Sequence, residues 1–235
     1  GLLYQAIARR SNLMRRFAMA VIALTIAKVF LLDAAGLTGV SRETMGRVQS
    51  YLGVLDVWRE RINLIGPGEG RHLWRRHVLD SLQLLQNISS EDKSVADLGS
   101  GAGFPGLILA CALAERPGAS VTLVEKSPRK SEFLRAAGKA LGLPVKVLTI
   151  RLEDAPGTHF DVVTARALAP LPKLLGFAAS WLKPSGKAVL MKGKDAAAEL
   201  AEARKDWTFE MSDRASLSSA EGRILTMSTI NPRRA

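Results

Sequence analysis

The stretch Val95–Gly106, VADLGSGAGFPG, joins the end of an apolar strand to a glycine-rich turn. The strand runs to Leu98, and three glycines follow at alternate positions: Gly99, Gly101 and Gly103. Such a turn lets backbone approach a ligand closely, and the apolar run after Pro105 predicts the start of a helix. The stretch therefore indicates a cofactor-binding turn in a Rossmann-like α/β domain.

The sequence on either side continues as alternating strands and helices. Apolar segments predict strands at 94–98, 120–125, 145–149, 160–164 and 186–191. Helical patterns lie between them, at 105–115, 128–141, 170–182 and 195–204. This alternation predicts a mostly parallel sheet with helices on both faces. Two further strands, near 206–211 and 223–230, have no helix between them and predict an antiparallel pair at the C-terminus, as in class I methyltransferases rather than dehydrogenases.

The segments before this core divide into an extension and two helices. Residues 1–30 are basic and apolar, and we expect an extension that packs on the domain or on a surface without stable membrane insertion. A targeting segment or a mis-assigned start of the chain are the alternatives. We expect residues 31–235 to form one domain of this methyltransferase-like fold, with N-terminal helices over 31–90 and the Rossmann-like core over 91–235. Apolar spacing predicts these helices at 42–63, capped by Ser41, and at 73–85 with Val78, Leu82 and Leu85 inward.

Composition points to a polyanionic partner. Lysine and arginine number 33 against 22 acidic residues, which gives a net charge of +11. This excess favours nucleic acid over an acidic membrane surface, and a merely solvated basic surface is the alternative. Cys111 is the only cysteine, so we expect a buried thiol in a reducing compartment. His72, His77 and His159 are scattered, and no metal site is predicted.

Two cofactor motifs overlap in the glycine-rich turn. Gly101, Gly103 and Gly106 form the GxGxxG of dinucleotide-binding proteins, whereas Gly99, Gly101 and Gly103 form the GxGxG of S-adenosylmethionine enzymes. The first glycine should follow the strand directly, and Gly99 does, which favours S-adenosylmethionine over NAD. Glu125, at the end of the second strand, is placed to accept hydrogen bonds from a ribose diol and suits either cofactor.

Several stretches together resemble the bacterial 16S rRNA guanine-N7 methyltransferases, the glucose-inhibited division protein B family. The likeness runs from about residue 31 to the C-terminus, and its most specific parts are RHVLDSL at 76–82 and DLGSGAGFPG at 97–106. Its other parts are WRERINLIG at 58–66, VTLVEKSPRKSEFLR at 121–135, FDVVTARALAPL at 160–171 and LKPSGKAVLMKGK at 182–194. Ile65 stands where the family commonly has threonine, which puts the role of that loop in doubt.

The resemblance implies positions for the cofactor site. It places Gly99, Phe104, Leu152, Glu153 and Arg166 at S-adenosylmethionine, together with the rest of the glycine turn. Glu153 would lie near the adenine amino group, with a solvated loop acid as its alternative. For Arg166, at the end of the fourth strand, a structural ion pair with Asp97 is the alternative; Asp97 itself would hold the glycine turn through backbone N–H groups.

The catalytic residues stay open at this stage. Arg76, His77 and Asp80 share one helix and either roof the active site or dock the helix by a polar pair. Lys192, after the fifth strand, points to the same edge of the sheet and would hold phosphate or substrate. Basic residues in the same regions are candidates for phosphate contacts: Arg71, Arg75, Lys126, Arg129, Lys130 and Lys194.

These observations predict a cytoplasmic, monomeric enzyme that transfers a methyl group from S-adenosylmethionine to N7 of a guanine in 16S rRNA or the small ribosomal subunit. Guanine N7 carries a free lone pair and no proton, so positioning matters more than a general base. A methyltransferase of the same fold acting on a small molecule or protein is one alternative. A non-catalytic RNA-binding relative is the other.

Overall fold

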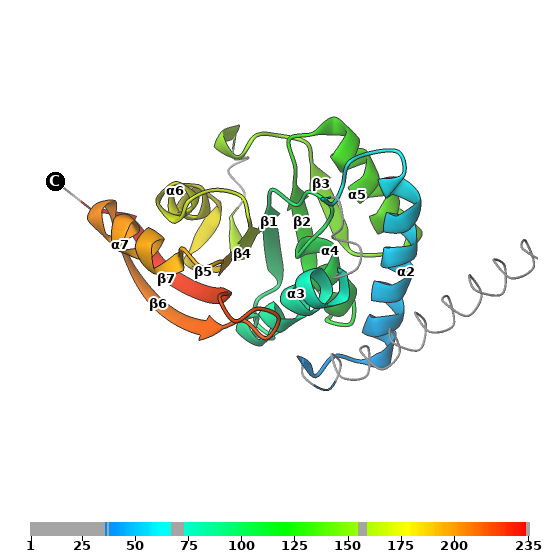
Figure 1. Ribbon diagram of the computed structural model, residues 1–235, viewed down its shortest axis with the longest axis horizontal. Helices are drawn as coiled ribbons and strands as arrows, with labels where there is room; N and C mark the ends of the chain where they lie inside the picture. The colour runs from blue at the N-terminus through cyan, green and yellow to red at the C-terminus, as the bar shows by residue number, and fades with distance from the viewer. Residues whose placement is uncertain (1–35, 37, 67–72, 155–158, 234–235) are drawn as a thin grey trace, which may run out of the picture. The chain divides into compact units, whose positions relative to one another are not determined.

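A seven-stranded sheet with the order β3-β2-β1-β4-β5-β7-β6 forms the centre of the protein (Figure 1). The strands are β1 Ser94–Leu98, β2 Ser120–Val124, β3 Val145–Leu148, β4 Phe160–Arg166, β5 Leu182–Lys192, β6 Trp207–Ala215 and β7 Arg223–Pro232. The first five pair in parallel, and β7 runs antiparallel to both β5 and β6. The predicted fold, a mostly parallel sheet closed by an antiparallel C-terminal pair, is confirmed.

The computed structural model describes residues 36, 38–66, 73–154 and 159–233. The predicted extension 1–30 and the candidate phosphate contact Arg71 lie outside these residues. Val40–Ala235 forms one compact unit, and it contains every helix and strand discussed below.

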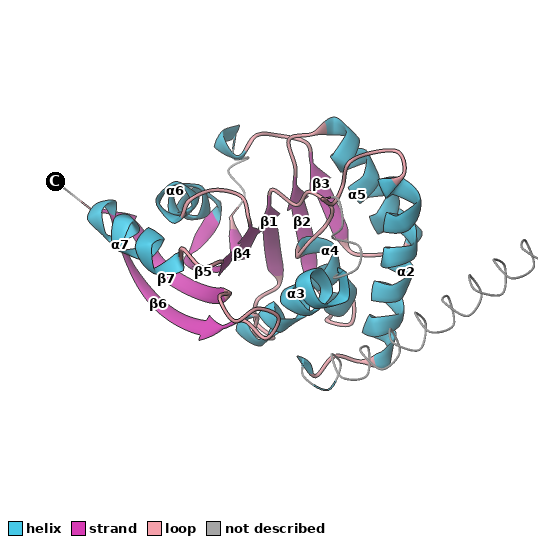
Figure 2. Ribbon diagram, in the orientation of Figure 1, coloured by secondary structure: helices cyan, strands magenta, loops and turns pink. Residues whose placement is uncertain are grey.

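Helices cover both faces of the sheet (Figures 1 and 2). The longer ones are α2 Arg42–Arg59, α4 Gly106–Leu113, α5 Pro128–Ala140, α6 Leu171–Trp181 and α7 Ala196–Asp206. On one face α4 and α5 pack on β2 and β3, and α2 lies across both helices. On the other face α6 packs on β4, β5 and β7, and α7 packs beside α6.

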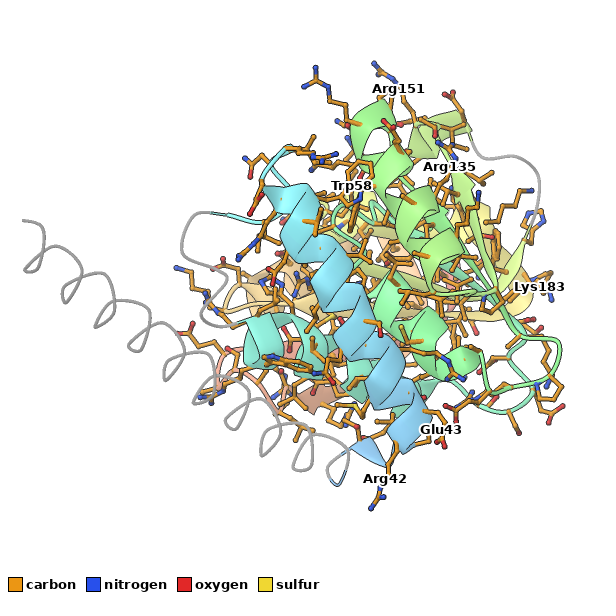
Figure 3. All side chains as sticks on the ribbon, turned by 90° about the vertical axis from the view of Figure 1, so that its right-hand side faces the viewer. Arg42, Glu43, Trp58, Arg135, Arg151 and Lys183 are labelled. Carbon is orange, nitrogen blue, oxygen red and sulfur yellow. The ribbon has the colours of Figure 1, made fainter. Side chains whose placement is uncertain are left out.

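The apolar stripe predicted for α2 is buried. Met45, Val48, Leu52 and Leu55 all lie in the core, because residues three and four apart share one face of a helix. The hydroxyl of the predicted cap accepts a hydrogen bond from Thr44 N at 3.0 Å. Near the other end, Trp58 meets the Phe133 ring of α5 edge-on, with 5.8 Å between ring centroids (Figure 3).

The helix predicted over 73–85 is not uniform. It consists of a π-helical turn, η2 Trp74–Leu79, then α3 Asp80–Leu82, then a 3-10 turn, η3 Gln83–Asn87. The winding loosens and then tightens, so an ideal helical period does not hold across the segment. As a result Leu84 is buried and Leu85 only half-buried, whereas the regular spacing predicted Leu85 inward.

The glycine-rich turn begins where β1 leaves the core. Alternate residues of β1 face opposite sides, and Ala96 and Leu98 belong to the cluster under α6 and α7. Asp97 faces the other side, toward the start of α4. A Cβ on Gly106 would lie 2.6 Å from Asp97 Oδ2, so only glycine lets the helix start so close to the strand. Among the helices described, none is long and apolar enough to cross a membrane.

Candidate active site

The carboxyl ends of the parallel strands bring the predicted site residues to one edge of the sheet. Gly99 and Glu125 directly follow β1 and β2, and Arg166 and Lys192 are the last residues of β4 and β5. Leu152 opens the short 3-10 turn that follows β3. Ligands of open α/β sheets bind at this edge, so the topology alone places these side chains near one another.

The glycine turn is fixed by backbone hydrogen bonds to the neighbouring strand. The N–H groups of Gly99 and Ser100 donate to the Val124 carbonyl at 2.9 and 3.0 Å. Gly99 and Gly101 have φ values of +71° and +55°, a region that favours glycine. A Cβ on Gly101 would meet only one protein atom, at 3.8 Å, so the space over this residue is open to a ligand.

Asp97 holds the end of the turn, but only one of its two carboxylate contacts is to a backbone N–H, the kind of group predicted. Its Oδ2 accepts the Gly106 N–H at 3.1 Å, and its Oδ1 accepts the Thr164 hydroxyl at 2.9 Å. Burial raises the pKa of Asp97 to about 6, although the hydrogen bonds it accepts work in the opposite direction. The carboxyl group therefore joins the start of helix α4, where the turn ends, to strand β4.

Glu125 presents its carboxylate at the turn. Its Oε2 accepts the Gly101 N–H at 3.0 Å, and its Oε1 accepts the Ser127 N–H at 2.8 Å. The residue is 8% exposed, and it lines a cavity. Each carboxylate oxygen has a further lone pair, so the fixed group can still accept hydrogen bonds from a ligand such as a diol.

This cavity, which we call the glycine-turn cavity, has a volume of about 340 Å³. Gly99, Gly101 and Glu125 line it together with apolar side chains, which are Val124, Ile150, Leu152, Leu168 and Phe177. Charged side chains also line it: Lys126, Lys130, Arg151, Glu153 and Lys173. A cavity that combines apolar side chains with a fixed acceptor suits a nucleoside.

A second cavity, which we call the Arg166 cavity, lies at the ends of β4 and β5 and has a volume of about 510 Å³. Its polar lining includes Arg76, His77, Asp80, Arg166, Lys192 and Glu199. It therefore brings together all four candidate catalytic residues, which are Arg76, His77, Asp80 and Lys192. No group of His, Cys, Asp or Glu suited to a metal ion occurs within the described ranges.

Arg166 connects β4 to the η2 segment. It donates to the Arg76 carbonyl at 2.8 Å, contacts His77 Nδ1, and pairs with Asp80 at 3.9 Å. Its guanidinium also lies over the Phe104 ring, 5.6 Å from the centroid. Arg166 therefore pairs with Asp80, and its charge also acts to lower the pKa of Asp97, which Thr164 and Gly106 hold by hydrogen bonds.

Asp80 also holds the loop between β6 and β7. Its Oδ1 accepts hydrogen bonds from Gln83 Nε2 at 2.8 Å, from the Ser216 hydroxyl at 3.0 Å, and from the Ser218 hydroxyl. Ser216 and Ser218 line the Arg166 cavity, and the sequence carried no signal for them. Both serines lie more than a hundred residues from Asp80 in the sequence. Serine is also common in turns, so neither position stands out.

Lys192 has its charge partner inside the protein. Its Nζ lies 2.6 Å from Glu199 Oε2 and donates to the Ala169 carbonyl at 3.1 Å, and its side chain is 9% exposed. Glu199, from the first turn of α7, is a third residue of this cavity that the sequence pattern did not indicate.

Of the other predicted residues, some line a cavity and some do not. Phe104 is buried behind the turn, with its ring against Tyr51 and His77 at centroid distances of 5.5 and 5.0 Å. Among the phosphate candidates, Lys126 and Lys130 line the glycine-turn cavity, and Arg129 is exposed next to them. Cys111 is buried as predicted, and burial raises the pKa of its thiol to about 12.

Comparison with known proteins gives a consistent result. The model of the family described as rRNA small subunit methyltransferase G matches residues 45–226. A Bradyrhizobium protein (strain ORS 278) named ribosomal RNA small subunit methyltransferase G is 45% identical over 85% of this chain and 91% of its own. A protein of the same name from Parvibaculum lavamentivorans is 44% identical over 81% of this chain and 85% of its own.

Solved structures resemble the fold at low sequence identity. A ribosomal protein L11 methylase from Lactobacillus delbrueckii superposes with a TM-score of 0.52 at 18% identity, covering 65% of this chain and 78% of its own. An S-adenosylmethionine-dependent methyltransferase from Aquifex aeolicus also gives 0.52, at 17% identity, covering 69% and 93%. These matches support the class I methyltransferase fold.

Proposed function

Because the chain belongs to the rRNA small subunit methyltransferase G family, we propose that it transfers a methyl group from S-adenosylmethionine to N7 of a guanine in 16S rRNA. The observation that carries the proposal is the family match over residues 45–226, which includes every residue lining the two cavities. The proposal includes a cytoplasmic, monomeric enzyme acting on the RNA or on the small ribosomal subunit.

The glycine-turn cavity fits the cofactor. Gly101 leaves room for a ligand, Glu125 offers fixed acceptor oxygens for the ribose diol, and Leu152, Leu168 and Phe177 offer apolar surface for the adenine ring. Bound there, S-adenosylmethionine supplies a methyl group on a sulfonium. NAD is disfavoured because the first glycine of the GxGxG motif directly follows β1.

We assign the Arg166 cavity to the guanine. Arg166 and Ala167 line this cavity, and the next two residues of the chain line the glycine-turn cavity, so the two sites share one wall. Guanine N7 needs no general base, and the protein's task is to hold the ring in line with the donor. The base gains positive charge as it reacts, and the carboxylates of Asp80 and Glu199 face the same cavity.

The direct test is mass mapping of N7-methylguanine in small-subunit rRNA from cells with and without the gene. The modified guanine should be lost on deletion and restored by the intact gene. Purified protein should methylate 16S rRNA or 30S particles in vitro. Unchanged N7-methylguanine in the deletion strain would reject the substrate, and methylation of a small molecule or protein instead would identify the alternative.

The cofactor assignment is tested at Gly101. Gly101→Val should abolish binding of S-adenosylmethionine in calorimetry, because the side chain would fill the space left for the ligand. Gly118→Val is the matched control: Gly118 has a φ of +76° and open space around its Cβ, but it lies between α4 and β2, away from the cavity. Equal loss of binding in both variants, or binding of NAD by the wild type, would contradict the assignment.

A further inference from the structure

The segment 166–171, which connects β4 to α6, forms the wall between the two cavities. Arg166 and Ala167 line the Arg166 cavity, whereas Leu168 and Ala169 line the glycine-turn cavity. A shift of this segment would therefore change both cavities together. Its position determines how the two proposed ligands meet.

The segment has a conformation that its own sequence does not favour. Ala167 has a φ of +49°, in the left-handed region that residues with a side chain rarely adopt. The next side chain, Leu168, lies against the glycine turn, so close that a Cβ on Gly99 would be 2.6 Å from Leu168 Cδ1. Such a backbone persists only where surrounding structure holds it.

Lys192 and Glu199 hold the segment from the side of β5 and α7. The ammonium of Lys192 donates to the Ala169 carbonyl at 3.1 Å and lies 2.6 Å from Glu199 Oε2. The same carboxylate oxygen accepts the Leu171 N–H at 2.5 Å. The pair thus binds a carbonyl and an N–H of the segment just beyond the strained residue.

We infer that Lys192 and Glu199 are a positioning pair for methyl transfer, which acts by fixing the segment 166–171 between the cofactor and the base. The part of the pair in methyl transfer rests on the proposed function. Its contacts with the segment 166–171 do not. A direct phosphate contact by Lys192 is disfavoured, because an approaching phosphate would meet the negative charge of Glu199 at the same ammonium.

The contacts can be tested on the protein without RNA. Lys192→Met and Glu199→Ala should each speed hydrogen exchange of the Leu171 amide, measured on peptides covering 167–172. Both should weaken calorimetric binding of S-adenosylhomocysteine, the demethylated product, by roughly tenfold, as expected for one charge-assisted hydrogen bond. The uncharged double variant Lys192→Met/Glu199→Leu removes both contacts and leaves no lone charge behind, so it tests the same exchange if a single variant does not fold.

The controls come from the same helix. Lys205 and Glu202 form an exposed pair on α7 at 2.7 Å, with side chains 67% and 59% exposed. Lys205→Met and Glu202→Ala should leave both loop exchange and product binding within about twofold of wild type, because exposed pairs contribute little.

A phosphate anchor predicts a different pattern. Lys192→Met would then weaken RNA binding and lower its salt slope by about one, and Glu199→Ala would strengthen RNA binding by removing a nearby negative charge. That pattern, with unchanged loop exchange and product binding, would overturn the inference. Failure of the wild type to methylate rRNA would instead reject the proposed function, since exchange and product binding are measured without RNA.

Discussion

We propose that Arg166, which links β4 to η2 and also lines the Arg166 cavity, acts on the ligand and is not only structural. We expect Arg166→Ala to lower kcat/KM. The corresponding loss of transition-state stabilisation should be about 1.5–3 kcal/mol, the usual value for a charge-assisted contact. The melting temperature without ligand should change little, because Asp80 keeps three other donors. Melting curves with and without S-adenosylmethionine, combined with turnover, measure both quantities.

The control for this substitution is Arg204→Ala. Arg204 also lies over a phenylalanine ring, Phe209, at 5.8 Å, but on α7 and β6, outside both cavities. The Arg204→Ala variant should have the same kcat/KM as the wild type. A large fall in the ligand-free melting temperature of Arg166→Ala, with kcat/KM of the folded variant unchanged, would remove Arg166 from the site.

Asp97 makes stability depend on pH. Its pKa of about 6 lies above the value near 3.9 of an unfolded aspartate, so the native state binds the proton more tightly. The resulting stabilisation is complete below about pH 4 and is lost as pH rises through 6, by roughly 3 kcal/mol in total. Asp97→Asn keeps an acceptor for the Gly106 N–H but cannot titrate.

Denaturant unfolding of both proteins at several pH values tests this. The stability of Asp97→Asn relative to wild type should rise between pH 4 and pH 7, because only the wild type loses its bound proton there. Taking the difference cancels the other titrating groups, which the two proteins share. A difference that stays constant with pH would show that Asp97 has an ordinary pKa.

Helix α2 supports the glycine turn from the face of the sheet that α4 and α5 cover. Tyr51, fully buried on α2, donates its hydroxyl to the Ala102 carbonyl inside the turn. Tyr51→Phe leaves that buried carbonyl without its donor, which should cost about 1–3 kcal/mol of unfolding free energy. S-adenosylmethionine affinity should fall as well, because the turn loses an anchor. An unchanged denaturation midpoint would show that water or another donor replaces the hydroxyl.

The elements themselves were largely predictable from local pattern. Short apolar runs bounded by polar or glycine residues identify buried parallel strands, and β1, β2 and β3 differ from their predicted ranges by at most a residue at either end. The segment 73–85 was harder, because its change of winding depends on packing and not on apolar spacing. Strand β5 also begins earlier than predicted, at Leu182. Pro184 and Gly186 interrupt the apolar pattern there, so the pattern could not indicate this extension.

The candidate site could be predicted only where its residues come together because strands end there. Gly99, Glu125, Arg166 and Lys192 come to one edge because parallel strands end there, whatever their side chains do. The partners of these residues were not predictable in the same way. Glu199 for Lys192 and Ser216 for Asp80 are set by how α7 and the β6–β7 loop pack, and neither residue has a distinctive neighbour in sequence.

At the scale of the whole molecule, the net charge of +11 bears on the rRNA proposal. Neutralising phosphates releases counterions, so affinity for 16S rRNA should fall steeply with salt. The basic residues must also lie where the RNA would bind. The candidate contacts Lys126, Arg129 and Lys130 lie at the start of α5, on the edge of the sheet that carries both cavities.

Helix α5 offers a test of that placement. Arg129 and Lys139 are both exposed, one at each end of the helix and about 15 Å apart along it, at opposite edges of the sheet. Arg129→Glu and Lys139→Glu change the net charge equally. If RNA lies across the site, Arg129→Glu should weaken rRNA binding and lower the salt slope by about one or two contacts, whereas Lys139→Glu should do so much less. Neither should alter S-adenosylmethionine affinity, since neither lines the glycine-turn cavity. Equal losses in the two variants across a salt series would mean that the RNA responds to total charge, and that this edge of the sheet is not its binding surface.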